Sequence, residues 1–186
     1  MKKTILTSVL VLITSICFSQ SMKGTPFYKT YEDYLNKKPM SGPMVKPNSL
    51  KSNIATGTSV VLVENGKEDR VSCDKLPHDL FLYYGGYMAK LIKVVGNTPY
   101  RVFTMGKMSY YADVFDEQRR FYQIDNGEVK RFKKGELEDF LQKYGLLEEF
   151  ENTKPKREKK DDVNGYFSKV VNHEIEYINK LNEKMK

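Results

Sequence analysis

The clearest pattern along this chain is a succession of short apolar runs separated by tight-turn residues, between residues 58 and 133. The Asn-Gly pairs at 65–66 and 126–127 suit the positive φ angles of two-residue type I′ hairpin turns. Gly85-Gly86 and Gly106-Lys107 separate further runs, and the glycine-first order of the second pair suits a type II′ turn. Four hairpins in succession predict about eight antiparallel strands.

This strand pattern predicts both a register and a fold class. A turn at 126–127 would place Ile124 opposite Val129 and Tyr122 opposite Arg131. Because no helix-length pattern separates the strands, a parallel βαβ fold is disfavoured. We therefore expect a mainly β fold with C-terminal helices (β+α). Its antiparallel meander would form a barrel, roll or sandwich, packed by a C-terminal helix.

The segment before the strands is expected to be irregular with one short helix. Thr30-Tyr31-Glu32-Asp33 has the order of a capping box, with Thr30 as N-cap. Lys38-Pro39 would end this helix, because the residue before a proline disfavours the helical conformation. The predicted organisation is a signal peptide at 1–19, the irregular segment at 20–57, the β domain at 58–133 and a helical segment at 134–186.

Helical periodicity returns after the strands. One short helix has an apolar face and ends at Gly145, a natural C′ residue. That face consists of Leu137, Phe140, Leu141 and Tyr144. After a lysine-rich link at 154–160, predicted to be solvated, Asp161 or Asp162 caps a final helix that runs to about Leu181. The apolar face predicted for it consists of Val163, Phe167, Val170, Ile178 and Leu181.

Glu174 interrupts the apolar face of this final helix. A carboxylate in such a place must find a partner, shift its pKa upward or leave the helix partly undocked. One interpretation is a pair with a lysine or arginine from the strands, or exposure at the rim of the helix. The other is a functional carboxylate that faces a cavity.

Tyrosines are concentrated in the predicted strands. Alternation sends Tyr83 and Tyr84 to opposite faces of the sheet, and Tyr110 and Tyr111 likewise, so one of each pair is expected to point outward or into a lumen. An aromatic face of this kind can stack on sugars or fill a protein interface, whereas the simpler interpretation is core filling. These four tyrosines and Glu174 are the candidate ligand-binding residues.

Two clusters carry residue types that occur in catalytic or metal sites. Cys73 and His78 are the types of a thiol–imidazole nucleophile, but no family signature surrounds the cysteine, and a half-buried strand-end cysteine is the simpler interpretation. His173-Glu174 resembles part of a zinc motif, yet Tyr177 stands where the second histidine belongs. We therefore predict no catalytic residue, no metal and no cofactor, and a non-enzymatic role is favoured.

The N-terminus has the order of a secretory signal peptide. Lys2-Lys3 precedes an apolar run at 5–16, and small residues at Cys17 and Ser19 predict cleavage after Ser19. The run is too short to span a membrane comfortably, and no later stretch approaches that length, so no transmembrane segment is expected after processing. A lipid anchor on Cys17 is the alternative, although Ile16 is larger than the residue usual before a lipidated cysteine.

Export and charge restrict the possible partners. The chain has a formal charge of +7, and removing Lys2-Lys3 leaves 29 basic against 24 acidic side chains, a charge of +5. Such a balance suits attraction to anionic envelope polymers or lipid headgroups without requiring a nucleic acid. After cleavage Cys73 is the single cysteine, so stability must come from core packing instead of an internal disulfide.

Several segments together resemble a group of bacterial proteins. These are Phe18-Ser19-Gln20, Tyr28-Lys29-Thr30-Tyr31-Glu32-Asp33-Tyr34-Leu35, Gly106-Lys107-Met108-Ser109-Tyr110-Tyr111, and the leucine-rich Leu137–Leu147 before a helical tail. The combination resembles small exported proteins of unknown function from flavobacteria-like bacteria. The resemblance implies a compartment and an architecture, but no functional residues.

The sequence thus predicts an exported, non-enzymatic binding or interaction protein of the bacterial cell envelope, periplasmic or extracellular. Its partner would be an envelope polymer, a small molecule or a protein, and not a nucleic acid. The alternatives are a barrel that carries a small apolar ligand, and a hydrolase that uses Cys73 and His78.

Overall fold

The computed structural model describes residues 24–53, 55, 57–85, 88–133 and 135–185. The predicted signal peptide at 1–19, with Cys17, lies outside the described residues. The chain forms two compact units, Met1–Pro99 and Tyr100–Lys186, and their boundary falls inside the predicted β segment 58–133. Across the described ranges, no helix has the length and apolar character needed to cross a membrane.

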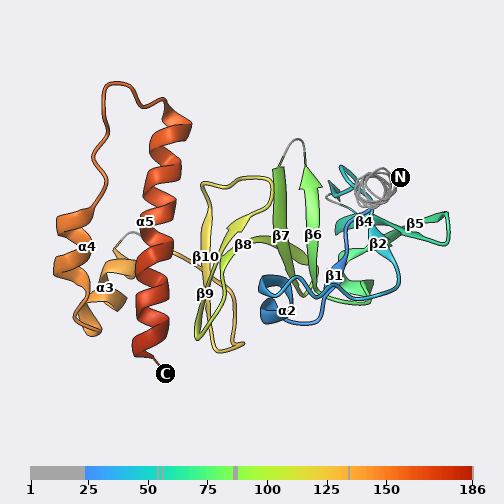
Figure 1. The fold of residues 1–186 in the computed structure, drawn as a ribbon, viewed down its shortest axis with the longest axis horizontal. Coiled ribbons are helices and arrows are strands. Elements are labelled where there is room, and N and C mark those ends of the chain that lie inside the picture. Colours follow the sequence, from blue (N-terminus) through green and yellow to red (C-terminus); the bar gives the residue numbers. More distant parts are fainter. Residues whose placement is uncertain (1–23, 54, 56, 86–87, 134, 186) are drawn as a thin grey trace, which may run out of the picture. The chain divides into compact units, whose positions relative to one another are not determined.

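The first unit contains two antiparallel sheets (Figure 1). Its elements are β1 (Phe27–Tyr28), α2 (Tyr31–Leu35), β2 (Met44–Val45), β3 (Lys51–Asn53), β4 (Gly57–Glu64), β5 (Lys67–Ser72), the 3-10 turn η1 (Cys73–Lys75), β6 (Leu80–Gly85) and β7 (Met88–Val95). In one sheet β5 covers one edge of β4, while β2 and β3 share the other edge; in the second sheet β6 lies between β1 and β7. Fully buried side chains from both sheets, among them Val60, Phe81 and Ile92, form its core.

Two local predictions are confirmed in this unit. The Thr30 hydroxyl accepts a hydrogen bond from the Asp33 backbone N–H at 3.0 Å, as expected of the N-cap residue. Asn65 and Gly66 have φ angles of 50° and 77°, and they join Glu64 to its strand partner Lys67. Both central residues of this hairpin are therefore left-handed, which is the conformation of a type I′ turn.

The second unit packs helices on an antiparallel sheet. Its elements are β8 (Thr98–Thr104), whose first two residues precede the unit boundary, β9 (Met108–Asp113), β10 (Arg120–Ile124), β11 (Lys130–Arg131), α3 (Glu136–Lys143), α4 (Leu147–Thr153) and α5 (Val163–Lys184). Figure 1 shows α5, in red, running alongside β9 and β10, and a single apolar cluster joins sheet and helices. Its most buried members are Met108, Tyr110, Leu141, Tyr177, Ile178 and Leu181.

The predicted fold class is confirmed: the chain is mainly antiparallel β with C-terminal helices packed on a sheet. Of the three predicted forms, the strand pairing speaks against the closed barrel. Within the described ranges β1 pairs with β6 alone and β11 with β10 alone, so the sheets end in edge strands instead of closing into a barrel.

The predicted end of α3 and the predicted start of α5 are confirmed. Gly145 has a φ of 68°, and its N–H donates to the Gln142 carbonyl at 3.1 Å, while the Leu146 N–H donates to the Leu141 carbonyl at 2.8 Å. This pair of hydrogen bonds is a Schellman motif. Helix α5 starts from an N-cap at Asp162 and continues past the predicted end to Lys184.

The type II′ turn predicted at Gly106-Lys107 is wrong. Gly106 does not have a left-handed φ, and a register shift between Val102 and Thr104 lengthens the connection from β8 to β9. Glycine is required there because a Cβ at Gly106 would lie 2.6 Å from Cγ of Asn182 on α5. The Asn182 amide accepts from the Met108 N–H at 2.6 Å and donates to the Met108 carbonyl at 2.9 Å.

The register predicted for the last hairpin is also wrong, by one residue. Phe121 pairs with Arg131 and Tyr122 with Lys130. The left-handed pair is Asp125-Asn126, with φ angles of 53° and 97°, and not Asn126-Gly127. The turn therefore starts one residue earlier, because aspartate also tolerates this conformation.

The face predicted for α5 is partly wrong. Ile178 and Leu181 are buried as expected, and Phe167 and Val170 are half-buried, but Val163 is 67% exposed. The first turns of α5 lie beside the exposed link, where Lys169 pairs with Asp161 at 2.9 Å. Burial on this helix therefore depends on what each turn packs against, and Val171 and Tyr177 complete the buried face.

Candidate functional site

The tyrosines of the first unit serve its core. Tyr83 is buried, and its hydroxyl accepts a hydrogen bond from the Leu50 backbone N–H at 3.2 Å. Burial raises the pKa of the Tyr83 phenol above its ordinary value. Tyr84 follows it in β6 and is half-buried. Neither tyrosine lines a described pocket of this unit.

In the second unit both Tyr110 and Tyr111 are buried, so of the two placements expected for one of the pair, outward or into a lumen, the outward one is not found. Strand β9 is covered on both faces from Met108 to Ala112. The Tyr111 hydroxyl donates to Oε1 of Gln123 at 2.9 Å, and its ring packs 5.8 Å from that of Tyr100. Tyr110 lies on the opposite face, beneath α5.

Tyr110 and Glu174 meet in a pocket of about 220 Å³ inside the second unit. The pocket is bounded by β9, β10, residues 132–138, α4, the link and α5. Its walls are largely apolar, with Phe132, Leu137 and Phe150 among them. Glu174, the residue that interrupts the apolar face of α5, thus lines a pocket.

Glu174 has two polar partners at this pocket. The Tyr110 hydroxyl donates a hydrogen bond to its Oε2, and Nε of Arg120 on β10 lies 3.9 Å from the same oxygen. The side chains of Arg120 and Glu174 are only 13% and 23% exposed. Glu174 therefore has an arginine partner from a strand, as the first interpretation expects, and it also lines a cavity.

Burial dominates the titration of this cluster. It raises the pKa of Glu174 above the ordinary value, against the lowering effects of the Tyr110 hydrogen bond and the Arg120 charge. Burial and the neighbouring carboxylate also raise the pKa of Tyr110, so the phenol keeps its proton and remains a donor. The cluster consequently holds a carboxylate with an upward-shifted pKa beside a permanent cation.

Arg120 was not singled out from the sequence. Its guanidinium carbon lies 5.2 Å from the ring centre of Phe103 and 4.5 Å from that of Phe167, so the group is held between aromatic faces. Among the described residues its Nη1 is buried without a hydrogen-bond partner. The only sequence signal was the general need of Glu174 for a cation from the strands.

Charged groups and a histidine surround the pocket. Lys133, Lys154 and Glu138 contribute to its lining, and Nζ of Lys154 lies 3.9 Å from Oε1 of Glu138. The His173 ring stacks on Phe150 with 4.6 Å between ring centres. Burial lowers the pKa of His173, so its neutral form is favoured.

The surroundings of Cys73 do not activate its thiol. Cys73 is buried, and burial together with the charge of Asp74 raises the pKa of its thiol to about 11. His78 packs edge-on against Phe27, 5.9 Å between ring centres. A nucleophilic cysteine requires a lowered pKa, so this thiol is the less reactive kind. A search of the described ranges for three or more clustered His, Cys, Asp or Glu side chains able to hold a metal finds none.

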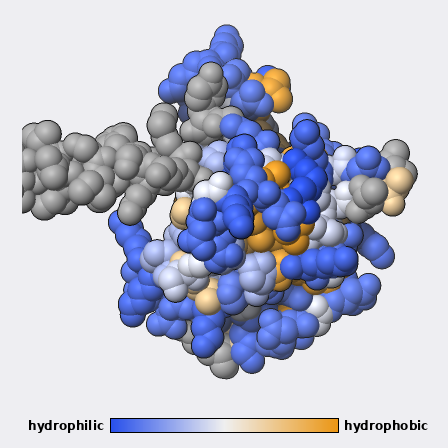
Figure 2. Space-filling view, turned by 90° about the vertical axis from the view of Figure 1, so that its right-hand side faces the viewer, coloured by the Kyte–Doolittle hydropathy of each residue, from blue (hydrophilic) through white to orange (hydrophobic). Residues whose placement is uncertain are grey.

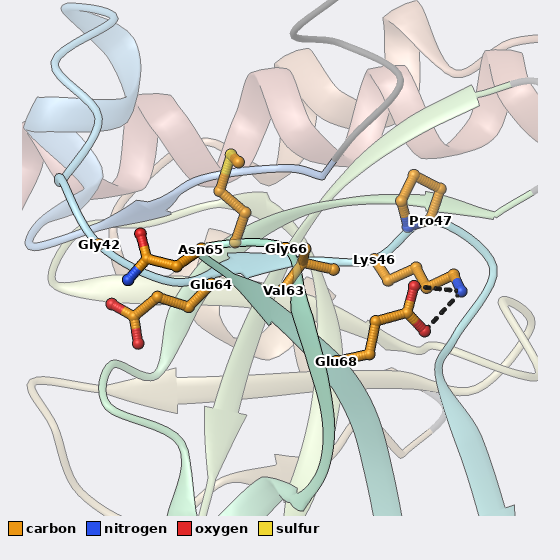
Figure 3. Close-up of a pocket in the computed structure, with 9 residues that line it drawn as sticks. Gly42, Lys46, Pro47, Val63, Glu64, Asn65, Gly66 and Glu68 are labelled. Carbon is orange, nitrogen blue, oxygen red and sulfur yellow. Dashed lines mark hydrogen bonds and ion pairs between the residues drawn. The ribbon is translucent and has the colours of Figure 1, made fainter.

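The first unit has a larger but more open groove of about 720 Å³, beside β2 and the β4–β5 hairpin (Figure 3). Nζ of Lys46 lies 2.7 Å from both carboxylate oxygens of Glu68, and these side chains are 45% and 51% exposed. The face seen in Figure 2 is mostly hydrophilic, with a limited hydrophobic area. Because the groove's ion pair is solvated, the pocket of the second unit is the stronger candidate site.

Comparison of the chain with protein families, with curated proteins and with solved structures gives no match.

Proposed function

We propose that the protein is an exported, non-enzymatic binding protein of the bacterial cell envelope, which holds a small molecule in the pocket of its second unit. The observation that carries this proposal is the position of Glu174: the ionisable group within the apolar face of α5 lines the pocket and has buried partners.

The energetics of burial support a binding role for this cluster. Taking a carboxylate and a guanidinium out of water costs several kcal/mol per ion in general, and well-packed apolar residues often replace such a pair without loss of stability. A fold that only needed to dock α5 would be served as well by apolar residues at both Glu174 and Arg120. Polar groups at the floor of an apolar pocket instead provide orientation and specificity for a ligand.

The size of the pocket restricts the ligand. A volume of 220 Å³ equals the liquid volume of about seven water molecules. Drug-sized ligands occupy pockets of roughly 300–1,000 Å³, so this site suits a smaller molecule or one terminal group of a larger one. This departs from the carrier alternative in architecture, because the pocket lies between a sheet and helices and not inside a barrel.

The proposal is tested by filling the pocket. Val170 lines it from α5, and Val170→Phe would occupy the space, whereas Val163→Phe adds the same group at an exposed position of the same helix. Chain lacking residues 1–19 would be incubated with a small-molecule extract of an envelope preparation and analysed by native mass spectrometry.

We expect adducts on the unmodified chain and on Val163→Phe that are absent from Val170→Phe and lost on denaturation. Identical adducts on all three chains, or none on any, would refute the pocket as the binding site. An intact envelope polymer or a protein retained equally by all three would transfer the function to the outer surface.

A further inference from the structure

We infer that this pocket takes one neutral, hydroxyl-rich unit, a hexose that is either free or at the end of a glycan. The inference rests on the proposed function, since it names the ligand class of the same site. Its basis is the juxtaposition of a neutralised ion pair, lysine donors and aromatic walls.

The charges at the floor favour a neutral ligand. Glu174 and Arg120 lie 3.9 Å apart and compensate each other, so the floor has no net charge when both are ionised. An ammonium group would bind Glu174 but approach the Arg120 cation, and a carboxylate would meet the reverse conflict. Like charges brought together in a desolvated site are strongly unfavourable.

The hydrogen-bonding capacity of the pocket matches hydroxyl groups. Glu174 is an acceptor, and Lys133 and Lys154, which also line the pocket, are donors. A hydroxyl both donates and accepts, so one molecule with neighbouring hydroxyls satisfies both kinds of group at once. Neither a purely apolar ligand nor a simple cation or anion does so.

The walls match the other surface of a sugar. Phe132 and Phe150 line the pocket, together with the aliphatic side chains of Leu137 and Val170. The apolar C–H face of a hexose packs against aromatic and aliphatic surface while its hydroxyls point to polar groups. The pocket volume of 220 Å³ accommodates one such ring and not two.

The rim does not reverse this preference. Lys133 and Lys154 are cations that would attract an acid, but Glu138 lies 3.9 Å from Nζ of Lys154 and reduces its field. The lining therefore combines three cations with two carboxylates, and an acidic ligand must still approach Glu174. An acid and an amine are accordingly the competing ligand classes that an experiment has to separate.

A charge series on one scaffold provides that separation. Glucose, galactose and mannose would each be compared with the corresponding 2-amino sugar and uronic acid by ligand-observed NMR, with the full chain lacking residues 1–19. We expect at least one neutral hexose to bind about tenfold more tightly than both of its charged counterparts, as like-charge repulsion requires. Tighter binding of the amines or of the acids, or no binding by any sugar, would overturn the inference.

Variants connect the preference to the floor of the pocket. Glu174→Gln should weaken the neutral hexose at least about tenfold, because it removes one hydrogen bond to a charged acceptor. Glu176→Gln is the matched control, since Glu176 is 58% exposed and pairs with Lys180 on the same helix. Equal affinity of Glu174→Gln and the control would also overturn the inference. The charge series uses the unmodified chain, so it decides the question even if Glu174→Gln fails to fold.

The source of the sugar is resolved by a second ligand. An oligosaccharide with the preferred hexose at its non-reducing end would bind more tightly than the free sugar if the protein reads glycan ends, and no better if it takes up free sugar. If no sugar binds but the extract adducts are still lost in Val170→Phe, this inference is rejected and the proposed function stands. If no sugar binds and no adduct depends on Val170, both are rejected.

Discussion

Replacing Arg120 by methionine isolates the charge that compensates Glu174. Methionine keeps an unbranched side chain between Phe103 and Phe167 but removes the guanidinium. At the observed 3.9 Å, two unit charges interact with about 4 kcal/mol at an effective dielectric constant of about 20. Without the arginine, Glu174 can become neutral by taking up a proton. The free energy of that protonation sets an upper limit on the destabilisation caused by Arg120→Met.

The limit follows from the ordinary pKa of a glutamate, 4.5. Keeping the carboxyl protonated at pH 7 costs about 1.4 kcal/mol for each pH unit above that value, or roughly 3 kcal/mol. Arg120→Met should therefore destabilise the second unit by up to roughly 3 kcal/mol at pH 7. Because its loss pushes the folded-state pKa of Glu174 higher still, the penalty should shrink as the pH falls toward 4.5.

Urea unfolding followed by circular dichroism at pH 7 and pH 4.5 measures both quantities. The double variant Arg120→Met/Glu174→Gln completes a mutant cycle, in which we expect a coupling energy of about 2 kcal/mol at pH 7. Additive single variants, or an Arg120→Met penalty that is the same at both pH values, would show that the two charges do not compensate each other. The neutral floor of the pocket would then lose its basis.

Three further predictions concern other contacts. Asn182→Ala should lower the free energy of unfolding by about 2 kcal/mol in a urea titration, because it removes two hydrogen bonds to Met108. Asn172 is exposed on the same helix, so Asn172→Ala should be nearly neutral. Equal effects of the two variants would contradict the role of Asn182 in docking α5 on β9. Burial lowers the pKa of His173, so around its ordinary pKa the folded state binds fewer protons than the unfolded state. The stability from this group is therefore lost as the pH falls below about 6.5. His173→Gln should flatten that part of a profile of unfolding free energy against pH, and an unchanged profile would contradict the burial effect. Cys73, with a pKa raised to about 11, should be alkylated by iodoacetamide about a hundredfold more slowly in the native chain lacking residues 1–19 than in urea, and equal rates would contradict its burial.

The sequence predicted elements well where local chemistry decides them. The hairpin at Asn65-Gly66 and the Gly145 helix end each depend on residues that tolerate a left-handed φ, and both positions were identified. The same reasoning failed by one residue at Asn126-Gly127, because Asp125 is equally compatible with the turn. The amide of Gln123 donates to the Gly127 carbonyl at 2.7 Å, a contact that letter patterns do not reveal.

Only part of the candidate site could be predicted from the sequence. Glu174 was recognisable because a carboxylate contradicts the apolar face around it, which is a property of neighbouring residues. Arg120 and the burial of Tyr111 depend instead on which strands and helices pack together. Its position at the start of a strand does not mark Arg120 as a site residue. Its role depends on the packing of α5, which brings the Phe167 ring against the guanidinium. Contacts between distant segments thus set the limit of the sequence reasoning here.

The pocket is shared by segments that are far apart along the chain, and Tyr110 and Glu174 have a sequence separation of 64 residues. Helix α5 provides Glu174, His173 and Val170, so a local opening that releases this helix abolishes the site without unfolding the sheet. A ligand that binds only the closed form must suppress such openings. At a ligand concentration of 100 times Kd, amide hydrogen exchange in α5 should slow by about a hundredfold, which reports binding even when the ligand is spectroscopically silent.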